Sequence, residues 1–209
     1  MFKRILIVSI AVWLGACAGG KIKQVPSEVR PTKKVDFFAG AYTQAAFKLT
    51  GTMNDNLLEG VLVVKKIGEE DFDVSVMSTG SYRVMQATLT PAGIAYRYLF
   101  PDADTALVRG RIHQFLNLLL LDAGVYQRRR VEKEELTVVY KNPSATVRLM
   151  YHAGQIYPYA AKTSMLLNIA DLTYNQYAPA DASGVVQVPH ELVYKDGKIE
   201  VILTLISLK

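Results

Sequence analysis

From Tyr42 onward, apolar and polar residues alternate in short segments separated by turn residues. In the clearest segment, Phe72, Val74 and Val76 alternate with polar residues, a pattern that predicts a half-buried strand. Connections as short as 78–81 and 91–93 predict an antiparallel meander. The strands predicted in this way cover 42–51, 57–67, 72–76, 82–90, 94–100, 125–131, 135–141, 145–152, the long segment 159–174, 186–194 and 198–208.

The apolar period changes to that of a helix after Phe100. The sequence Pro101-Asp102-Ala103-Asp104 is typical of a helix start, with Asp102 or Asp104 as the N-cap. Apolar residues then recur every three or four positions, and the last turns are apolar nearly all round. A helix of this kind must be enclosed, so we expect it to lie against or inside a curved sheet. The residues that carry this pattern are Val108, Ile112, Phe115, Leu116, Leu118, Leu119, Leu120 and Leu121.

The chain ends in a predicted hairpin whose two strands are joined at Lys195-Asp196-Gly197, since Asp-Gly is a strong hairpin signal. In its last strand one face carries Ile199 and three further apolar residues, and the other carries Ile202 and Ile206. We therefore predict that this strand is buried on both sides. An antiparallel sheet that is apolar on both faces needs a cover, or a lipid, on each.

The N-terminus has the layout of a secretory signal, with basic residues Lys3 and Arg4 before an apolar run of about ten residues. That run is too short to span a membrane, which takes roughly 20 residues. It closes on Leu14-Gly15-Ala16-Cys17, which resembles a bacterial lipobox. The resemblance implies cleavage before Cys17, the only cysteine in the chain, and lipidation of its thiol. Ala18 rather than Asp at the next position favours sorting to the outer membrane.

Three segments follow from these patterns: a signal peptide (1–16), a lipidated Cys with a flexible tether (17–35), and one folded domain (36–209). The tether contains Gly19, Gly20, Pro26 and Pro31 and little apolar material. Without the signal peptide the chain has 22 basic and 19 acidic residues, a mild net charge of +3. This balance gives no nucleic-acid footprint.

The expected fold class is mainly β (α+β): an antiparallel meander of about ten strands that forms an incomplete barrel, with the mid-chain helix on its concave side. This element order resembles the bacterial lipoprotein carrier and receptor family, LolA and LolB. The likeness covers roughly residues 40 to 208. Three short patterns also carry it: Gly60-Val61-Leu62-Val63-Val64, Leu89-Thr90-Pro91-Ala92-Gly93 and Val188-Pro189-His190.

In that family the receptor carries a protruding apolar residue in a loop between early strands. The nearest loop here, Ser78-Thr79-Gly80-Ser81, has no large apolar side chain, and we predict that Leu57 belongs to a strand core. The resemblance thus favours a lipid-binding barrel over a lipoprotein receptor.

No catalytic, metal or cofactor motif stands out, so we predict that the protein is not an enzyme and needs no cofactor. The three histidines are far apart and lack metal-ligand spacing, and His113 is expected to be a partly exposed helix residue. For Arg128-Arg129-Arg130, alternation argues against one patch; an anion or headgroup contact and ion pairs with neighbouring glutamates are the alternatives. Residues 94, 96, 98 and 100 are predicted to share one strand face. The candidate residues that line an acyl-sized cavity are Tyr96, Tyr98, Phe100, Phe115, Leu116 and Leu119.

Together these features predict a lipoprotein anchored in the outer membrane, facing the periplasm, which binds a hydrophobic or acylated ligand. A role in transferring lipoproteins or lipids to the outer membrane is the specific form of this hypothesis. The alternative is an accessory lipoprotein with a filled core, which docks onto a protein partner in an envelope assembly.

Overall fold

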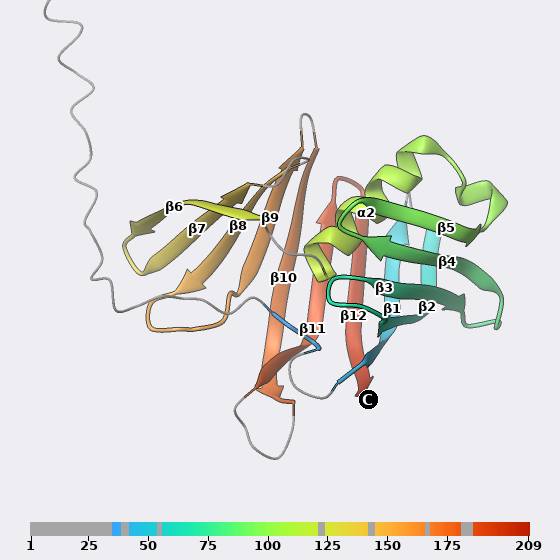
Figure 1. Ribbon diagram of the computed structural model, residues 1–209, viewed down its shortest axis with the longest axis horizontal. Helices are drawn as coiled ribbons and strands as arrows, with labels where there is room; N and C mark the ends of the chain where they lie inside the picture. Colours follow the sequence, from blue (N-terminus) through green and yellow to red (C-terminus); the bar gives the residue numbers. More distant parts are fainter. Residues whose placement is uncertain are drawn as a thin grey trace, which may run out of the picture.

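The computed structural model describes residues 35–38, 42–53, 56–120, 124–141, 145–165, 168–180 and 186–209. Within these ranges the chain forms twelve strands and one α-helix, which follows a short 3-10 turn (Figure 1). The elements are β1 (Gln44–Met53), β2 (Asn56–Lys66), β3 (Phe72–Ser78), β4 (Arg83–Thr90), β5 (Gly93–Leu99), η1 (Pro101–Ala103), α2 (Ala106–Leu120), β6 (Val125–Glu132), β7 (Glu135–Lys141), β8 (Thr146–His152), β9 (Ala160–Met165), β10 (Asn168–Pro179), β11 (Gln187–Asp196) and β12 (Ile199–Leu208).

All twelve strands belong to one antiparallel sheet, in the order β5-β4-β3-β2-β1-β12-β11-β10-β9-β8-β7-β6. The chain runs from the central strand β1 outward to β5 and crosses by way of α2 to the opposite edge at β6. It then returns strand by strand to β12, which pairs with β1. The edge strands β5 and β6 do not pair with each other, so the barrel is incomplete. The predicted fold class is therefore confirmed.

Two details of the strand prediction are wrong. The segment 159–174 forms two strands, β9 and β10, because the chain reverses between Met165 and Asn168. The last strand is not buried on both sides, since Ile206 on its outer face is exposed. Alternation in this strand places its buried residues toward the sheet interior only.

The core lies on one face of the sheet, called here the inner face. Cross-strand pairs place apolar residues of neighbouring strands side by side on it: Phe47 pairs with Leu62 and with Leu205, and Leu192 pairs with Leu203. Alternation along each strand therefore continues from strand to strand as one buried surface. Its completely buried members include Phe47, Leu62, Leu89, Leu172, Leu192 and Leu203.

A short segment ahead of β1 also belongs to the core. The ring of Phe37 packs edge-on against that of Phe47 at 5.2 Å, and the ring of Phe38 lies 5.4 Å from that of Phe72. Both phenylalanines are buried, and Val35 packs against the same core. The packed part of the chain thus begins before the first strand. The lipobox, Cys17 and most of the predicted tether lie outside the described residues.

Candidate ligand-binding face between the sheet and helix α2

Helix α2 contacts the inner face at two places that are far apart in the sheet. At Arg109 it contacts Tyr96 of β5, and at Arg111 and Phe115 it contacts Asp196 and Tyr194 of β11. In a flat sheet β5 and β11 would lie about 29 Å apart, which is six spacings of about 4.8 Å. Residues 109 and 111 are separated by only about 3 Å along the helix axis. The sheet must therefore curve around α2, which Figure 1 shows beside β4 and β5 with its last turns near β10 and β11.

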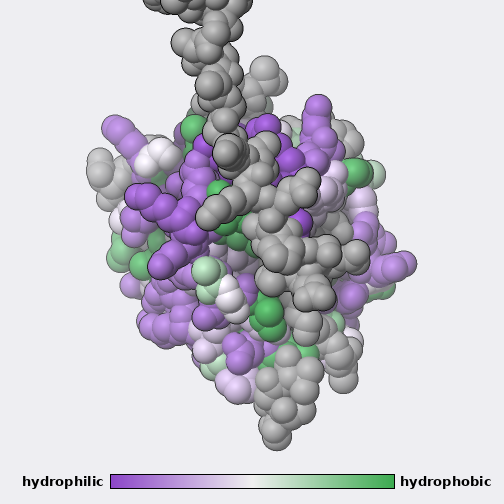
Figure 2. All heavy atoms as spheres, turned by 90° about the vertical axis from the view of Figure 1, so that its left-hand side faces the viewer, coloured by the Kyte–Doolittle hydropathy of each residue, from purple (hydrophilic) through white to green (hydrophobic). Residues whose placement is uncertain are grey.

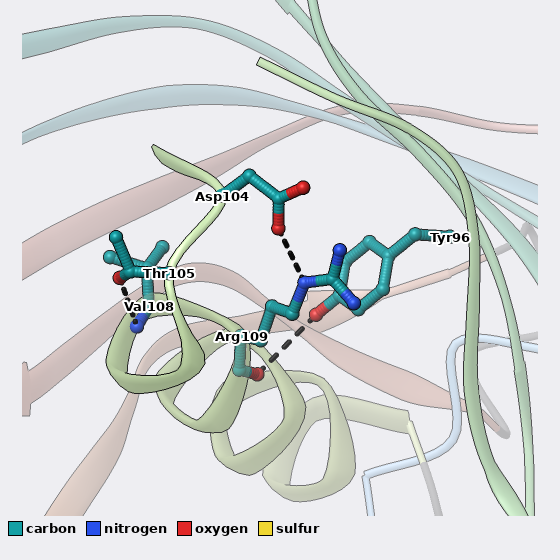
Figure 3. Close-up of polar contacts among 5 residues, drawn as sticks. All are labelled: Tyr96, Asp104, Thr105, Val108 and Arg109. Atoms are coloured by element: carbon teal, nitrogen blue, oxygen red, sulfur yellow. Dashed lines mark hydrogen bonds and ion pairs between the residues drawn. The ribbon is translucent and has the colours of Figure 1, made fainter. Parts of the chain in front are cut away.

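The first turns of α2 are attached to β5 by a polar contact group (Figure 3). The Tyr96 hydroxyl donates to the Arg109 carbonyl oxygen at 3.3 Å, and the Arg109 guanidinium lies over the Tyr96 ring at 5.1 Å. Arg109 Nε also pairs with Asp104 Oδ1. The ion pair lowers the pKa of Asp104, and burial raises the pKa of Tyr96. Because Arg109 and Asp104 are solvent-exposed, this group positions the helix more than it stabilises it.

The prediction that Asp102 or Asp104 caps the helix is wrong. The helix begins at Ala106, and the Val108 amide donates to Thr105 Oγ1 at 3.3 Å, so Thr105 is the N-cap. The sequence 101–103 forms the separate turn η1, which delays the helix start. Asp104 accepts from the Arg109 side chain instead.

The second half of α2 is enclosed, as predicted, whereas its first half is exposed. Leu116 and Leu119 are buried in the core, and Phe115 meets Tyr194 edge-on at 5.0 Å. In contrast, Leu107 is 61% exposed. The candidate residues Phe115, Leu116 and Leu119 are thus brought together on the inner face, and Tyr96 lies at its β5 side.

Tyr98 and Phe100 do not share this face with Tyr96. The pairing between β4 and β5 shifts by one residue between Gln86 and Ala87, so Tyr96 pairs with the buried Ala87 and Tyr98 with Gln86. The shift moves Tyr98 to the outer face and Leu99 inward. The predicted common face of residues 94, 96, 98 and 100 is therefore wrong, and Tyr98 and Phe100 are both exposed.

A group of buried polar residues lies where α2 crosses β11, and the sequence patterns did not reveal it. Arg111 Nε lies 3.5 Å from Asp196 Oδ2. Asp196 and Gln114 are each only 4% exposed. Burial, followed by the charge of Asp196, raises the pKa of the neighbouring Tyr194. The sequence signal was present in the helix, because Arg111, Gln114 and Asn117 interrupt the apolar pattern at every third residue.

The core also contains three tyrosines from β8 and β10: Tyr151 and Tyr174 are buried, and Tyr177 is partly buried. Burial raises the pKa values of Tyr151, Tyr174 and Tyr177 well above the ordinary tyrosine value. The Tyr177 hydroxyl donates to the Pro158 carbonyl oxygen at 2.6 Å. These rings add large apolar area with a polar tip, a combination suited to the edge of a hydrophobic interior.

Two large side chains protrude where the early hairpins turn. Leu57, at the start of β2, is 70% exposed, so the prediction of a core position is wrong. Tyr82 is 77% exposed and directly follows the predicted turn 78–81. A large side chain is therefore present at this turn after all. The pairing of β2 with β3 puts Leu57 and Tyr82 at the same end of the sheet.

The other polar residues that the sequence singled out lie at or near the surface of the molecule. His113 is half-buried, and burial lowers its pKa. Arg130 pairs with Glu132, whereas Arg129 is half-buried on the opposite face of β6. The side of the molecule formed by β6 to β8 is mainly hydrophilic, with a few isolated hydrophobic residues (Figure 2).

In the described ranges, His, Cys, Asp and Glu side chains form no group of three that could hold a metal ion. Within the same part of the chain, no helix combines the length and the apolar character needed to cross a membrane.

Comparison of the folds places the chain among known structures. The crystal structure of a LolA superfamily protein from Nitrosomonas europaea matches with a TM-score of 0.59 over 82% of this chain and 87% of that one, at 14% identity. The chain has a LolA-like fold. A protein domain from Vibrio parahaemolyticus, described as an outer membrane lipoprotein-sorting protein, matches with a TM-score of 0.47 over 80% of this chain and 84% of that one, at 8% identity. No protein-family model and no curated protein sequence matches the chain.

The LolA-like fold agrees with the resemblance drawn from element order. At 14% identity the similarity concerns the fold and transfers no residue roles. In this chain the fold consists of an open sheet with one helix across its inner face.

Proposed function

We propose that this protein binds a hydrophobic or acylated ligand between the inner face of the sheet and α2, without transforming it. The observation that carries the proposal is the LolA-like arrangement of one curved sheet around one helix that buries Leu116 and Leu119 against it. For a ligand to reach the inner face, the enclosed second half of α2 has to move away from it, while the first turns are already solvated. This is the behaviour that a lid over a hydrophobic interior requires.

The specific form of the proposal is an outer-membrane lipoprotein that takes part in transferring lipoproteins or lipids. Cys17 in a lipobox and Ala18 after it support the anchor and the sorting. Two acyl chains give stable anchoring, since each buried methylene contributes about 0.8 kcal/mol. The exposed Leu57 and Tyr82 at one end of the sheet support contact with a membrane or a cargo.

Native mass spectrometry of the mature chain carrying Cys17→Ser tests ligand binding directly. We expect complexes with diacylated lipopeptides or phospholipids and none with a peptide of the same sequence that lacks acyl chains. Absence of every lipid complex contradicts the proposal. In that case, recovery of one stoichiometric protein partner by crosslinking in cells would establish the docking alternative.

Labelling with a fatty-acid probe in cells tests the anchor separately. The chain with its natural Cys17 is expected to incorporate the probe, and the Cys17→Ser variant to lose it. Labelling that persists in the variant overturns the lipobox assignment.

A further inference from the structure

One row of side chains crosses the outer face of the sheet, which is the face opposite the core. Its neighbouring members are register partners on adjacent strands, so they point to the same side of the sheet. Val138 and Leu149, which adjoin the row along the chain, belong to the core on the other side. The row begins at the edge strand β6 and continues from strand to strand as far as the exposed Leu57 on β2. Its members on β6 to β9 are Arg128, Val139, Arg148 and Lys162.

The two halves of this row carry charge in different ways. On β10 to β12 opposite charges alternate, so Lys195 has an acidic residue on each side and its Nζ lies 2.9 Å from Glu200 Oε2. On β6 to β9 every charged member is a cation. We call Arg128, Arg148 and Lys162 the β6–β9 basic row. Arg148 and Lys162 are direct register partners, and like charges directly opposite each other in a sheet are destabilising. This half of the row therefore costs stability.

The protein neutralises the β6–β9 basic row only weakly. Among the described residues Arg128 and Arg148 form no ion pair, and Lys162 Nζ lies 3.5 Å from Asp171 Oδ2. Both arginines are exposed, as is 43% of the Lys162 side chain. Protection of a free sheet edge against pairing does not explain the row, because Arg148 lies two strands in from the edge strand β6. The cations are thus available to an anion from outside the chain.

The surface of a bilayer fits this row better than a single small anion does. Guanidinium and ammonium groups both bind phosphate oxygens, and here they are spread over four neighbouring strands of an exposed face. The same row ends at Leu57, so its cations lie at the end of the sheet where Leu57 and Tyr82 protrude. An unstructured chain as long as the predicted tether, 17–35, has an average span of roughly 25 Å, so a lipid on Cys17 keeps the domain within reach of its bilayer.

We propose that the β6–β9 basic row docks the domain onto a bilayer by binding the phosphate head groups of anionic phospholipids. This contact turns the end of the sheet that carries Leu57 and Tyr82 toward the membrane. The docking surface rests on the proposed membrane anchor, because a few exposed charges act effectively only while the tether keeps the domain near the bilayer.

Sedimentation with vesicles measures this contact in the mature chain carrying Cys17→Ser, which has no lipid of its own. At about 0.1 M salt, where the Debye length is about 10 Å, we expect stronger binding to vesicles of phosphatidylglycerol and phosphatidylcholine in equal parts than to pure phosphatidylcholine. Arg128→Gln combined with Arg148→Gln should lower the partition coefficient onto the anionic vesicles roughly 25-fold, since each basic residue at an anionic surface contributes roughly fivefold. The control, Lys48→Gln combined with Lys133→Gln, removes the same charge at exposed positions outside the row and should change the coefficient by about twofold or less.

Acetylation of lysine side chains, detected by mass spectrometry, locates the contact without a substitution in the row. On anionic vesicles Lys162 is expected to be protected from the reagent, whereas Lys48 and Lys133 should react as they do in the free chain. Unchanged reactivity of Lys162 would contradict the proposed surface.

Several outcomes would overturn the docking surface. These are equal binding to the two kinds of vesicle and equal losses in the two double variants. Release by inorganic phosphate at the same ionic strength would point to a site for one phosphate group, and binding to oligoglutamate but not to anionic vesicles would point to an acidic protein partner. Fatty-acid labelling at Cys17 tests the anchor separately. Absence of labelling with retained vesicle binding refutes the anchor alone, whereas a labelled chain whose double variants partition equally refutes the basic row alone.

Discussion

The packing of α2 against the inner face predicts a large difference between two leucines of the same helix. Leu116 is 0% exposed, whereas Leu107, less than three turns earlier, projects into solvent. Replacing either by Ala makes the same chemical change and favours the helix backbone equally. Loss of a fully buried leucine side chain costs about 2–5 kcal/mol, including the cavity that remains. The same substitution at a surface position changes stability by about 0.5 kcal/mol or less.

Urea unfolding of the mature Cys17→Ser chain, followed by circular dichroism, measures this difference. With a urea dependence of about 2 kcal/mol per molar, a loss of about 3 kcal/mol lowers the midpoint by about 1.5 M. We expect this shift for Leu116→Ala and a shift of about 0.25 M or less for Leu107→Ala. Equal midpoints would refute the reasoning, because they would mean that α2 unfolds independently of the sheet. Hydrogen exchange over residues 106–120 would then rise in Leu116→Ala with no change in the global transition.

Three further predictions concern the sheet and the helix attachment. A methyl group on Gly60 would lie 2.2 Å from the backbone oxygen of Met77, so Gly60→Ala should cost at least about 3 kcal/mol or prevent folding, as measured by urea unfolding. Burial and a carboxylate partner raise the pKa of Tyr159 to about 12, so its contribution to stability is complete below about pH 10 and is lost between about pH 10 and 12. The urea midpoint should therefore fall across this interval, in step with tyrosinate absorbance. Tyr96→Phe removes the hydrogen bond to Arg109, so amide exchange should increase in the first turns of α2 with at most about 1 kcal/mol lost overall.

The fold could be predicted from the sequence because most of its determinants are local. Alternation within single strands and short polar turns specify an antiparallel meander, and the change of period after Phe100 specifies one helix. The position of β12 beside β1 could not be predicted in this way, because pairing between the two ends of the chain leaves no local pattern. The register shift between β4 and β5 also leaves no local pattern in the sequence. For this reason the prediction placed Tyr98 on the wrong face of β5.

The candidate site was only partly predictable. Phe115, Leu116 and Leu119 follow from helical periodicity, whereas the contact between Arg111 and Asp196 joins segments that are distant in the sequence. The case of Asp196 shows the difficulty. In sequence, Asp196-Gly197 predicts the centre of a turn, but β11 extends through Asp196 and the two turn residues are Gly197 and Lys198. Gly197 has a φ of 59°, which supplies the turn conformation and leaves the Asp196 side chain to point inward.

The pairing of β1 with β12 has a consequence for the order in which the protein can fold. Gln44 and Lys209 exchange backbone hydrogen bonds of 2.8 Å in both directions, and Thr43 is also bonded to Lys209, 166 residues away. During synthesis from the N-terminus, β1 to β5 can form local hairpins early, but the free edge of β1 stays unpaired until the last residues emerge. An unpaired central strand is prone to pair with other chains. The two halves of the sheet also join only at a contact with high loop-closure entropy, which slows folding. A truncation of even one C-terminal strand would open the sheet at its centre and not at its margin.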